Sequence, residues 1–484
     1  MHGSYINGQW LTEGNSFEVT SPVTGDTHAQ IHACSRSDVA LAIESAQAAF
    51  PAWAALAQEE RAAYMLKVAE QIELLGAEIA ENLMYEVGSW IGKAKGEAGS
   101  AGGMFRAAAE IAQQVTGYDL VSPTGRKSFV VREPLGVVSV ITPWNVPFGL
   151  SSRTTSGILA VGNTVVLKPS ELSPISGGIL LAKAVDQAGV PPGVFNVVCS
   201  SRAGVMEVGD EMVSHKGVKA LSFTGSTQVG KALAGKASQH LKKVSMELGG
   251  KDAMIVMSDA DIDGAVNAAV FSSFNHSGQI CMGTKRIFVD DKIADEFVNK
   301  FVTQTQGLGV GDVTDMAKPI APLINDTQVQ KLQEQVEDAK AKGATVLTGG
   351  GYQGLFFEPT VLTDVNESMK TWSEESFGPL VSVYRFKDVN SAISMLNDCE
   401  YGLSASVITQ DTEKGVEVAK QIESGMCHIN DGTVYAEPLA PFGGAKNSGV
   451  GRYGGLASVE SFTTTRWVTV SDKTPDYPPV FMGK

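Results

Sequence analysis

Between residues 137 and 246 the sequence alternates short apolar runs with stretches of helical spacing. Consecutive parallel strands need a crossover connection, which a helix usually supplies, so this alternation predicts a mainly parallel sheet with helices on both faces. The predicted strands are 137–141, 164–167, 194–198, 220–223 and 244–246. An open sheet of this kind binds ligands beyond the carboxyl ends of its strands, where Lys168, Gly225 and Glu247 are placed.

A second alternating region follows residue 281 and predicts a second α/β domain. At 484 residues the chain exceeds one ordinary core, which also favours two large domains. The strands predicted in this region are 286–289, 344–347, 381–386, 405–408 and 427–429.

Helical spacing recurs between the predicted strands and before them. One helix is predicted to begin at a Ser173–Pro174 cap and to end at Gly189. The other predicted helices are 37–50, 59–75, 77–87, 227–238, 293–305, 327–342, 389–397 and 412–423.

The ends of the chain have strand character. Residues 1–33 show short alternating runs with turn signals at Asn7–Gly8 and Thr24–Gly25, which are typical of hairpins. Residues 119–136 predict a small ribbon. The tail 463–470 alternates β-branched residues without a local partner, so we expect it to pair with that ribbon or with another chain.

The composition excludes several classes of protein. A net charge of -15 argues against a nucleic-acid partner, because such proteins usually carry a basic face. The five cysteines form no CxxC pair, and no run of about eighteen apolar residues occurs, so we expect a cytoplasmic protein with no membrane partner. His28, His32 and Cys34 do not follow ordinary zinc spacing, and no metal site is predicted.

Two side chains suggest chemistry. Cys281 follows a polar, glycine-containing loop, and Glu247 ends an apolar run beside Gly249 and Gly250. A thiol and a carboxylate on loops suggest a nucleophile and a base, provided that the thiol has a partly exposed site in a positive or helix-terminal environment. A lone cysteine is more often a small buried apolar residue.

Several motifs along the chain decide between these alternatives. They are PWNVP at 143–147, KPSE at 168–171, FTGST at 223–227, MELGGK at 246–251, GQICMG at 278–283, EESFGP at 374–379 and PFGGAKNSGVGR at 441–452. In kind and order they closely resemble the pattern of the aldehyde dehydrogenase superfamily.

This resemblance implies the aldehyde dehydrogenase fold, an α/β fold with three parts. A Rossmann-like NAD-binding domain would comprise residues 1–118 and 137–248, and an α/β catalytic domain residues 249–448. A small β oligomerisation ribbon and tail would comprise 119–136 and 449–484 and would join chains into a homodimer or homotetramer.

The resemblance also assigns catalytic roles. Cys281 would attack an aldehyde to give a thiohemiacetal, which loses hydride to a nicotinamide and leaves a thioester. Glu247 would activate the hydrolytic water or take the thiol proton. Asn145 would stabilise the oxyanion together with the Cys281 amide, although an Asn beside proline more commonly satisfies its own turn.

Cofactor contacts follow from the same motifs. Glu171 would accept hydrogen bonds from the adenosine ribose and repel a 2′-phosphate, which favours NAD, with NADP as the alternative. The Gly225–Gly230 turn departs from GxGxxG but would place amides at a pyrophosphate. The predicted cofactor contacts are Trp144, Lys168, Glu171, Gly225, Ser226, Glu375 and Phe377.

The substrate is expected to be a small aldehyde. The stretch HINDGTVYAEPLAPFGG resembles the family members that act on benzaldehyde, salicylaldehyde and vanillin, which favours an aromatic substrate. Arg153, Tyr435 and Phe442 are the candidate substrate contacts. Arg153 would meet an anionic or hydroxyl substituent, or it would form a surface or interface salt bridge instead.

Other activities remain as alternatives. An aliphatic aldehyde or semialdehyde dehydrogenase would use the same motifs. A CoA-acylating dehydrogenase typically lacks the glutamate that matches Glu247. A cysteine hydrolase would need a histidine near the thiol, and the motif gives His276 no such role.

Overall fold

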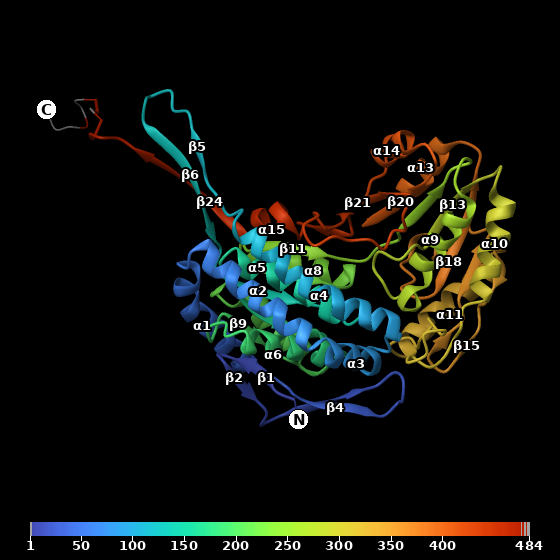
Figure 1. Ribbon diagram of the computed structural model, residues 1–484, viewed down its shortest axis with the longest axis horizontal. Helices are drawn as coiled ribbons and strands as arrows, with labels where there is room; N and C mark the ends of the chain where they lie inside the picture. The colour runs from blue at the N-terminus through green and yellow to red at the C-terminus, as the bar shows by residue number, and fades with distance from the viewer. Residues whose placement is uncertain (1, 476, 479–480, 482–484) are drawn as a thin grey trace.

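The computed structural model describes residues 2–475, 477–478 and 481. They form two α/β bodies, each built on its own sheet, and a ribbon that projects from the first body (Figure 1). Met1 and residues 476, 479–480 and 482–484 lie outside the described part, so the predicted tail 449–484 is covered incompletely.

The first body is built on an eight-stranded sheet with the order β2-β1-β9-β8-β7-β10-β11-β23. Strands β7 to β11 are parallel, which confirms the five strands predicted from the alternation. The strands of this sheet are β1 Ser4–Ile6, β2 Gln9–Leu11, β7 Val137–Ile141, β8 Thr164–Lys168, β9 Phe195–Val197, β10 Val218–Thr224, β11 Lys243–Glu247 and β23 Gly449–Val450.

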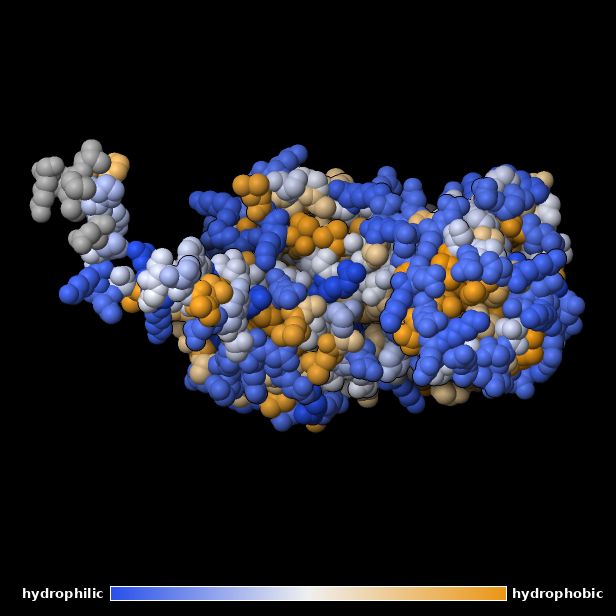
Figure 2. All heavy atoms as spheres, turned by 90° about the horizontal axis from the view of Figure 1, so that it is seen from above, coloured by the Kyte–Doolittle hydropathy of each residue, from blue (hydrophilic) through white to orange (hydrophobic). Residues whose placement is uncertain are grey.

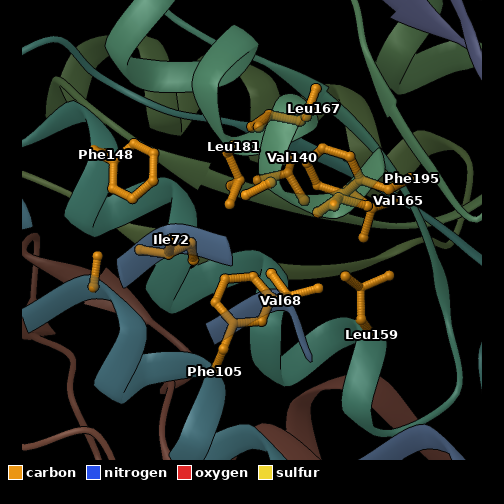
Figure 3. Close-up of a cluster of buried hydrophobic side chains, with 14 of the residues drawn as sticks. Val68, Ile72, Phe105, Val140, Phe148, Leu159, Val165, Leu167, Leu181 and Phe195 are labelled. Atoms are coloured by element: carbon orange, nitrogen blue, oxygen red, sulfur yellow. The ribbon is translucent and has the colours of Figure 1, made fainter. Parts of the chain in front are cut away.

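Helices cover both faces of this sheet, because its central strands are apolar on both sides. Val165 and Leu167 of β8 share a fully buried cluster with Ile72 and Phe105 (Figure 3), whereas Val166 between them packs on the opposite face. The helices of this body are α1 Arg36–Ala54, α2 Gln58–Leu74, α3 Gly76–Val87, α4 Ile91–Ala112, α5 Pro147–Ala160, the π-helical turn η1 Ile175–Ile179, α6 Leu180–Gln187, α7 Val205–Ser214, α8 Thr227–Gln239 and α15 Gly455–Phe462.

The second body contains a seven-stranded sheet with the order β14-β17-β18-β13-β12-β20-β21. Five of its strands were predicted, and β12 and β17 were not. The strands are β12 Ala253–Val256, β13 Arg286–Asp290, β14 Thr345–Thr348, β17 Thr360–Thr363, β18 Leu380–Phe386, β20 Ser404–Ile408 and β21 Met426–Ile429. The helices are α9 Ile262–Phe274, the short η2 Asn275–Gly278, α10 Ala294–Gln306, α11 Asp326–Ala341, α12 Lys370–Ser373, α13 Val389–Asn397 and α14 Thr412–Ala419.

The projecting ribbon confirms that the tail pairs with the 119–136 region. Strand β24, Thr463–Val470, runs antiparallel to β6, Lys127–Pro134, over its whole length, and β5, Tyr118–Leu120, pairs with the other edge of β6. The remaining short strands are β3 Ser16–Thr20, β4 Thr27–His32, β15 Tyr352–Gln353, β16 Phe356–Phe357, β19 Tyr401–Gly402 and β22 Ala445–Lys446. The domain boundaries themselves stay a prediction.

Helix α4 was not predicted, since its sequence is rich in glycine, a poor helix former. Tertiary packing overrides this propensity. One face of α4 is buried against α2 and α5 and contributes Ala94, Ala101 and Phe105 to the core. The helix matters for function because another of its faces lines a cavity, as described below.

The prediction that Ser173 caps the following helix with its side chain is wrong. The hydroxyl of Ser173 has no hydrogen-bond partner among the described residues. The carboxylate of Glu86, from the end of α3, accepts hydrogen bonds from the amides of Ile175 and Ser176 at 2.8 and 2.7 Å instead. Burial raises the pKa of Glu86 to about 7 against the opposing effect of the Ser176 and Ile175 hydrogen bonds.

None of the helices within the described ranges is both long enough and apolar enough to cross a membrane. All five cysteines are free thiols. The cytoplasmic location predicted from the sequence stays a prediction.

Candidate active site

Cys281 lies where two cavities meet. It follows η2, in the segment that leads into β13, and its side chain is partly exposed. A cavity of about 330 Å³ reaches it from the side of α4 and α5, and a cleft of about 210 Å³ reaches it from the carboxyl end of the first sheet. We call these the apolar cavity and the polar cleft. Two different ligands can therefore reach one thiol.

The apolar cavity is walled mainly by carbon atoms. Phe271, Ile280 and Met282 from the second body face Val146 and Leu150 of the first. Helix α4 adds small residues, and the residues on its cavity side are Gly92, Lys93, Gly96, Glu97, Ser100 and Met104. A cavity with such walls suits a flat apolar ligand with few polar groups.

Arg153 is the polar group beside the thiol in this cavity. Its guanidinium lies over the Phe442 ring at 4.8 Å, and Nη1 donates to the carbonyl of Glu437 at 3.1 Å. Burial lowers the pKa of Arg153 to about 10, against the opposing effect of Glu247 and Cys281. Arg153 is buried and forms no ion pair among the described residues, so the predicted alternative of a surface salt bridge is wrong, whereas that of an interface salt bridge stays a prediction.

Of the two aromatic residues predicted to contact the substrate, only Phe442 lines the apolar cavity. Phe442 is buried and lines the apolar cavity. Tyr435 is exposed, its hydroxyl donates to Oε1 of Glu437 at 2.6 Å, and its side chain does not line the cavity. Its neighbours Val434 and Ala436 line the cavity instead, which the sequence did not indicate.

The polar cleft gathers most of the residues predicted to contact a cofactor. Trp144 and Phe377 meet edge to face, with 5.6 Å between ring centroids. Ser226 is the N-cap of α8, so the positive end of that helix opens into the cleft. The predicted contacts that line the cleft are Trp144, Gly225, Ser226, Glu375 and Phe377. Gln328 and Lys331 of α11 also line it, although no motif pointed to them.

Lys168 and Glu171, the other two predicted cofactor contacts, do not line the polar cleft. The ammonium of Lys168, the last residue of β8, is buried and donates to the carbonyl of Pro169 at 3.0 Å. Burial lowers its pKa, which Glu171 partly offsets. Glu171 forms an ion pair with the exposed Arg202 at 2.9 Å. Lys168 therefore lies at the carboxyl end of β8, as the alternation predicted, and Glu171 follows three residues later.

Glu247 ends β11 but lines neither cavity. Its Oε1 occupies space beside Gly443, where an added Cβ would lie only 2.5 Å away. Neither carboxylate oxygen has a hydrogen-bond partner among the described residues. Burial raises the pKa of Glu247 well above its usual value, against the lowering effect of Arg452 and Arg153. The carboxyl group therefore lies beside Gly443, in surroundings that disfavour its charged form.

The environment of the Cys281 thiol is not the positive one that the sequence argument required. Burial raises its pKa, and the nearby carboxyl groups of Asp252, Glu375 and Glu247 raise it further, while the Met282 amide opposes them. The thiol is consequently protonated at neutral pH in the protein alone.

Asn145 lies within reach of the thiol segment. Its Nδ2 donates to the carbonyl of Gln279, two residues before Cys281, at 2.9 Å. An amide nitrogen carries two hydrogens, so one donor remains. The Asn145 side chain also lines the polar cleft next to Cys281. It does not satisfy its own turn, which was the structural alternative.

The segment before the thiol has an unusual backbone. His276, Ser277 and Gly278 all have left-handed φ values, 51°, 53° and 71°. Ser277 Oγ donates to the carbonyl of Ala321 at 2.7 Å, and the Gln279 side chain accepts from the Ile324 amide at 3.0 Å. The His276 ring lines neither cavity, which removes the histidine that a cysteine hydrolase would need.

Comparisons with known proteins agree with this geometry. The aldehyde dehydrogenase family profile matches residues 10–468, and the chain belongs to that family of aldehyde-oxidising enzymes. The chain is 39% identical to a vanillin dehydrogenase of Pseudomonas fluorescens over 96% of each chain, and 38% identical to a benzaldehyde dehydrogenase [NAD(+)] of Pseudomonas putida over 99% of this chain and 98% of the other. A crystal structure of a salicylaldehyde dehydrogenase from Pseudomonas putida G7, complexed with salicylaldehyde, superimposes with a TM-score of 0.96 at 38% identity over 98% of this chain and 99% of the other.

The raised pKa of Cys281 predicts slow alkylation at neutral pH. Only the thiolate reacts with iodoacetamide, so the rate at Cys281 in the cofactor-free protein is expected to rise about tenfold per pH unit from pH 7 to 9. Mass spectrometry of the peptide that contains Cys281 measures this rate, with N-acetylcysteine as the reference thiol. A rate that levels off below pH 8 would show a lowered pKa and contradict the prediction.

Proposed function

We propose that this enzyme oxidises an aromatic aldehyde to the carboxylic acid with NAD as the hydride acceptor. The observation that carries the proposal is the placement of Cys281 on the wall shared by the apolar cavity and the polar cleft. An aldehyde in the cavity and a nicotinamide in the cleft would both lie against the thiol. A thiol adduct between two such ligands is what aldehyde oxidation requires.

In this proposal the Cys281 thiol first loses its proton to water, and the resulting thiolate adds to the carbonyl carbon, which forms the C–S bond and turns the carbonyl oxygen into an oxyanion. The free Nδ2 hydrogen of Asn145 stabilises that oxyanion. The nicotinamide, when bound, supplies the hydride acceptor, so that the carbon becomes a thioester. Trp144, Glu375 and Phe377 line the cleft at the place where a nicotinamide would be held.

Glu247 is proposed as the base for thioester hydrolysis. Only the carboxylate form can take a proton from water, and the charges of Arg452 and Arg153 favour that form against the effect of burial. The carboxyl group would have to turn from its place beside Gly443 to reach the thioester carbon. Water would add to that carbon, Glu247 would take its proton, and the Cys281 thiolate would leave.

NAD is proposed over NADP. Glu171, in the motif after β8, offers a carboxylate to a ribose hydroxyl and repels a phosphate. Arg202, which pairs with Glu171, is the feature that favours the alternative, since a guanidinium binds a 2′-phosphate well. The family assignment fits either cofactor.

The aromatic class follows from the walls of the apolar cavity. Small residues on α4, Gly96 and Ser100, leave room for a ring between that helix and Phe271. Arg153 lies where a hydroxyl or methoxy substituent could accept a hydrogen bond. An aliphatic aldehyde or a semialdehyde is the second candidate, and it would leave most of this surface without contacts.

The activity is tested by following absorbance of the reduced cofactor with benzaldehyde, vanillin and short aliphatic aldehydes. We expect NAD to give the higher kcat/KM, aromatic substrates to be preferred, and CoA to have no effect. Cys281→Ala should abolish turnover and keep NAD binding, whereas the control Cys399→Ala, another partly exposed free cysteine, should keep activity. Substantial turnover by Cys281→Ala would contradict the mechanism, and clearly better use of NADP would contradict the cofactor assignment.

The proposed position of the aromatic ring of the substrate is tested by filling the apolar cavity at Gly96. A Cβ added at Gly96 has no atom within 4 Å, so Gly96→Leu should fold, and its side chain should extend into the cavity that Gly96 lines. The kcat/KM for vanillin is expected to fall about tenfold or more, while that for acetaldehyde changes less than about twofold. Gly99→Leu is the matched control, because Gly99 is equally open but lies outside the cavity. Equal effects of the two variants would contradict this placement of the ring.

We also propose assembly into a homodimer or homotetramer through the β5, β6 and β24 ribbon. The ribbon stands away from both bodies (Figures 1 and 2) and exposes Tyr118, Leu120 and Trp467. An exposed strand edge with apolar side chains is a ready pairing surface. Light scattering should show two or four chains, and Leu120→Asp should weaken assembly more than Leu41→Asp, an exposed leucine of α1. A stable monomer would contradict this.

A further inference from the structure

We propose that Lys93 and Glu97 of α4 form a buried pair that positions Asn145 for oxyanion stabilisation. The inference rests on the catalytic role proposed for Asn145. Neither residue belongs to a motif of the sequence, and neither is proposed to touch the reacting atoms. They are positioning residues, which act through the loop that carries Asn145.

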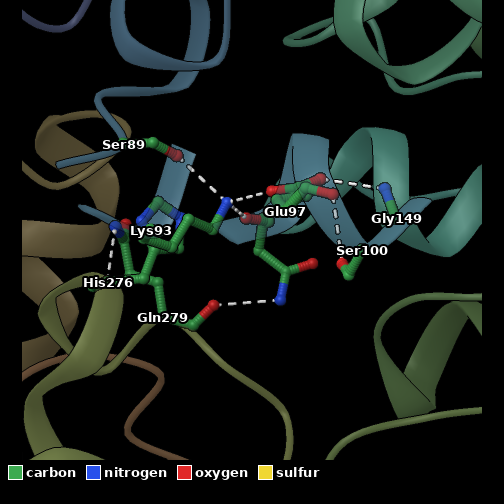
Figure 4. A network of polar contacts seen from close by, with 8 residues as sticks. Ser89, Lys93, Glu97, Ser100, Gly149, His276 and Gln279 are labelled. Carbon is green, nitrogen blue, oxygen red and sulfur yellow. Dashed lines mark hydrogen bonds and ion pairs between the residues drawn. The ribbon is translucent and has the colours of Figure 1, made fainter. Parts of the chain in front are cut away.

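Lys93 holds the backbone of Asn145 itself. Its ammonium donates to the Asn145 carbonyl at 2.9 Å, to Ser89 Oγ at 3.0 Å and to Glu97 Oε2 at 2.5 Å (Figure 4). An ammonium has three hydrogens, so each one has a partner. The position of the Asn145 peptide is therefore tied to helix α4.

Glu97 holds the other side of the same loop. Its Oε1 accepts a hydrogen bond from the Gly149 amide at 2.9 Å, in the first turn of α5. The N-cap of α5 is Val146, which has no side-chain acceptor, and its first residue is Pro147, which has no amide hydrogen. Glu97 thus supplies from another helix the cap that α5 lacks.

The two contacts tie Asn145 and the helix that follows it to α4. Lys93 holds the carbonyl of Asn145, and Glu97 holds the first turn of α5, four residues later in the chain. Its own Nδ2 then donates to Gln279 beside the thiol, so the second hydrogen has a defined direction. An oxyanion donor works only when its direction is set before reaction.

Burial argues that the pair is present for position rather than for stability. The side chains of Lys93 and Glu97 are only 6% and 3% exposed. Removing two charges from water costs several kcal/mol, and an apolar pair of similar volume is often as stable. A chain that keeps both charges here gains directed hydrogen bonds to backbone groups that apolar residues would not provide.

The test uses the full-length enzyme with both charges removed together, which avoids an unpaired buried charge. In Lys93→Met/Glu97→Gln, the glutamine oxygen can still accept from Gly149, but the bond to the Asn145 carbonyl is lost. Rapid mixing with NAD and benzaldehyde gives the rate constant of the first cofactor reduction. Loss of one oxyanion donor costs about a hundred- to thousandfold, so a displaced donor should cost roughly ten- to a hundredfold. The Kd for NAD should stay unchanged.

A double-mutant cycle with Asn145→Ala decides whether the pair acts through Asn145. If it does, the paired substitution should slow reduction less than about twofold further in the Asn145→Ala background. Equal fold losses in both backgrounds would overturn the proposal, and so would no loss in the parent. A normal rate in Asn145→Ala itself would instead refute the oxyanion role in the proposed function.

The control is Lys183→Met/Glu78→Gln, which removes a half-exposed ion pair between α6 and α3 and should leave the rate constant unchanged. A loss of rate in this control similar to that in the Lys93 variant would also overturn the proposal. If the paired variant gave no soluble protein, Lys93→Met alone, which removes the bond to the Asn145 carbonyl, would enter the same cycle. A loss that disappears with Asn145→Ala would support the proposal, and an additive or absent loss would overturn it.

Discussion

The left-handed turn at His276, Ser277 and Gly278 is the constraint on which the site depends, because it delivers Cys281 to the junction of the two bodies. Two of its residues carry side chains, and each costs about 1 kcal/mol or more in this conformation. A Cβ at position 278 would lie 2.2 Å from the Gly378 carbonyl, so only glycine fits there. The buried ammonium of Lys285 donates to the carbonyls of both Gly278 and Gly378 and so ties the thiol segment to the EESFGP loop that borders the cofactor cleft.

The protein surroundings at this junction disfavour the charged forms of the two proposed reactive groups. The pKa values of Cys281 and Glu247 are both raised, chiefly because the surrounding protein removes water from the charged forms of these groups. Arg153 faces the thiol from the substrate side and also favours the charged form of Glu247, so one guanidinium links the substrate cavity with the proposed base.

The sequence predicted the features that local pattern determines. The central strands of both sheets are buried runs between turn signals, and the motifs placed Trp144, Gly225 and Glu375 around the cleft. It could not predict features that arise from tertiary contact. Lys93 and Glu97, four residues apart on a glycine-rich helix, resemble an ordinary exposed pair, and only the fold brings Asn145 to them. Tyr435 could not be distinguished from its cavity-lining neighbours, because the direction of a loop side chain depends on the backbone.

The central claim is that Cys281 carries the substrate as a thioester that Glu247 then releases. Acid quenching of Glu247→Gln after mixing with NAD and vanillin, followed by peptide mass spectrometry, tests it most directly. The peptide that contains Cys281 is expected to carry an acyl group with the mass of vanillic acid minus water, at about one per chain. Without NAD, no acyl group is expected on this peptide. An acyl group on any other residue, or none on Cys281 while reduced cofactor accumulates, would contradict it.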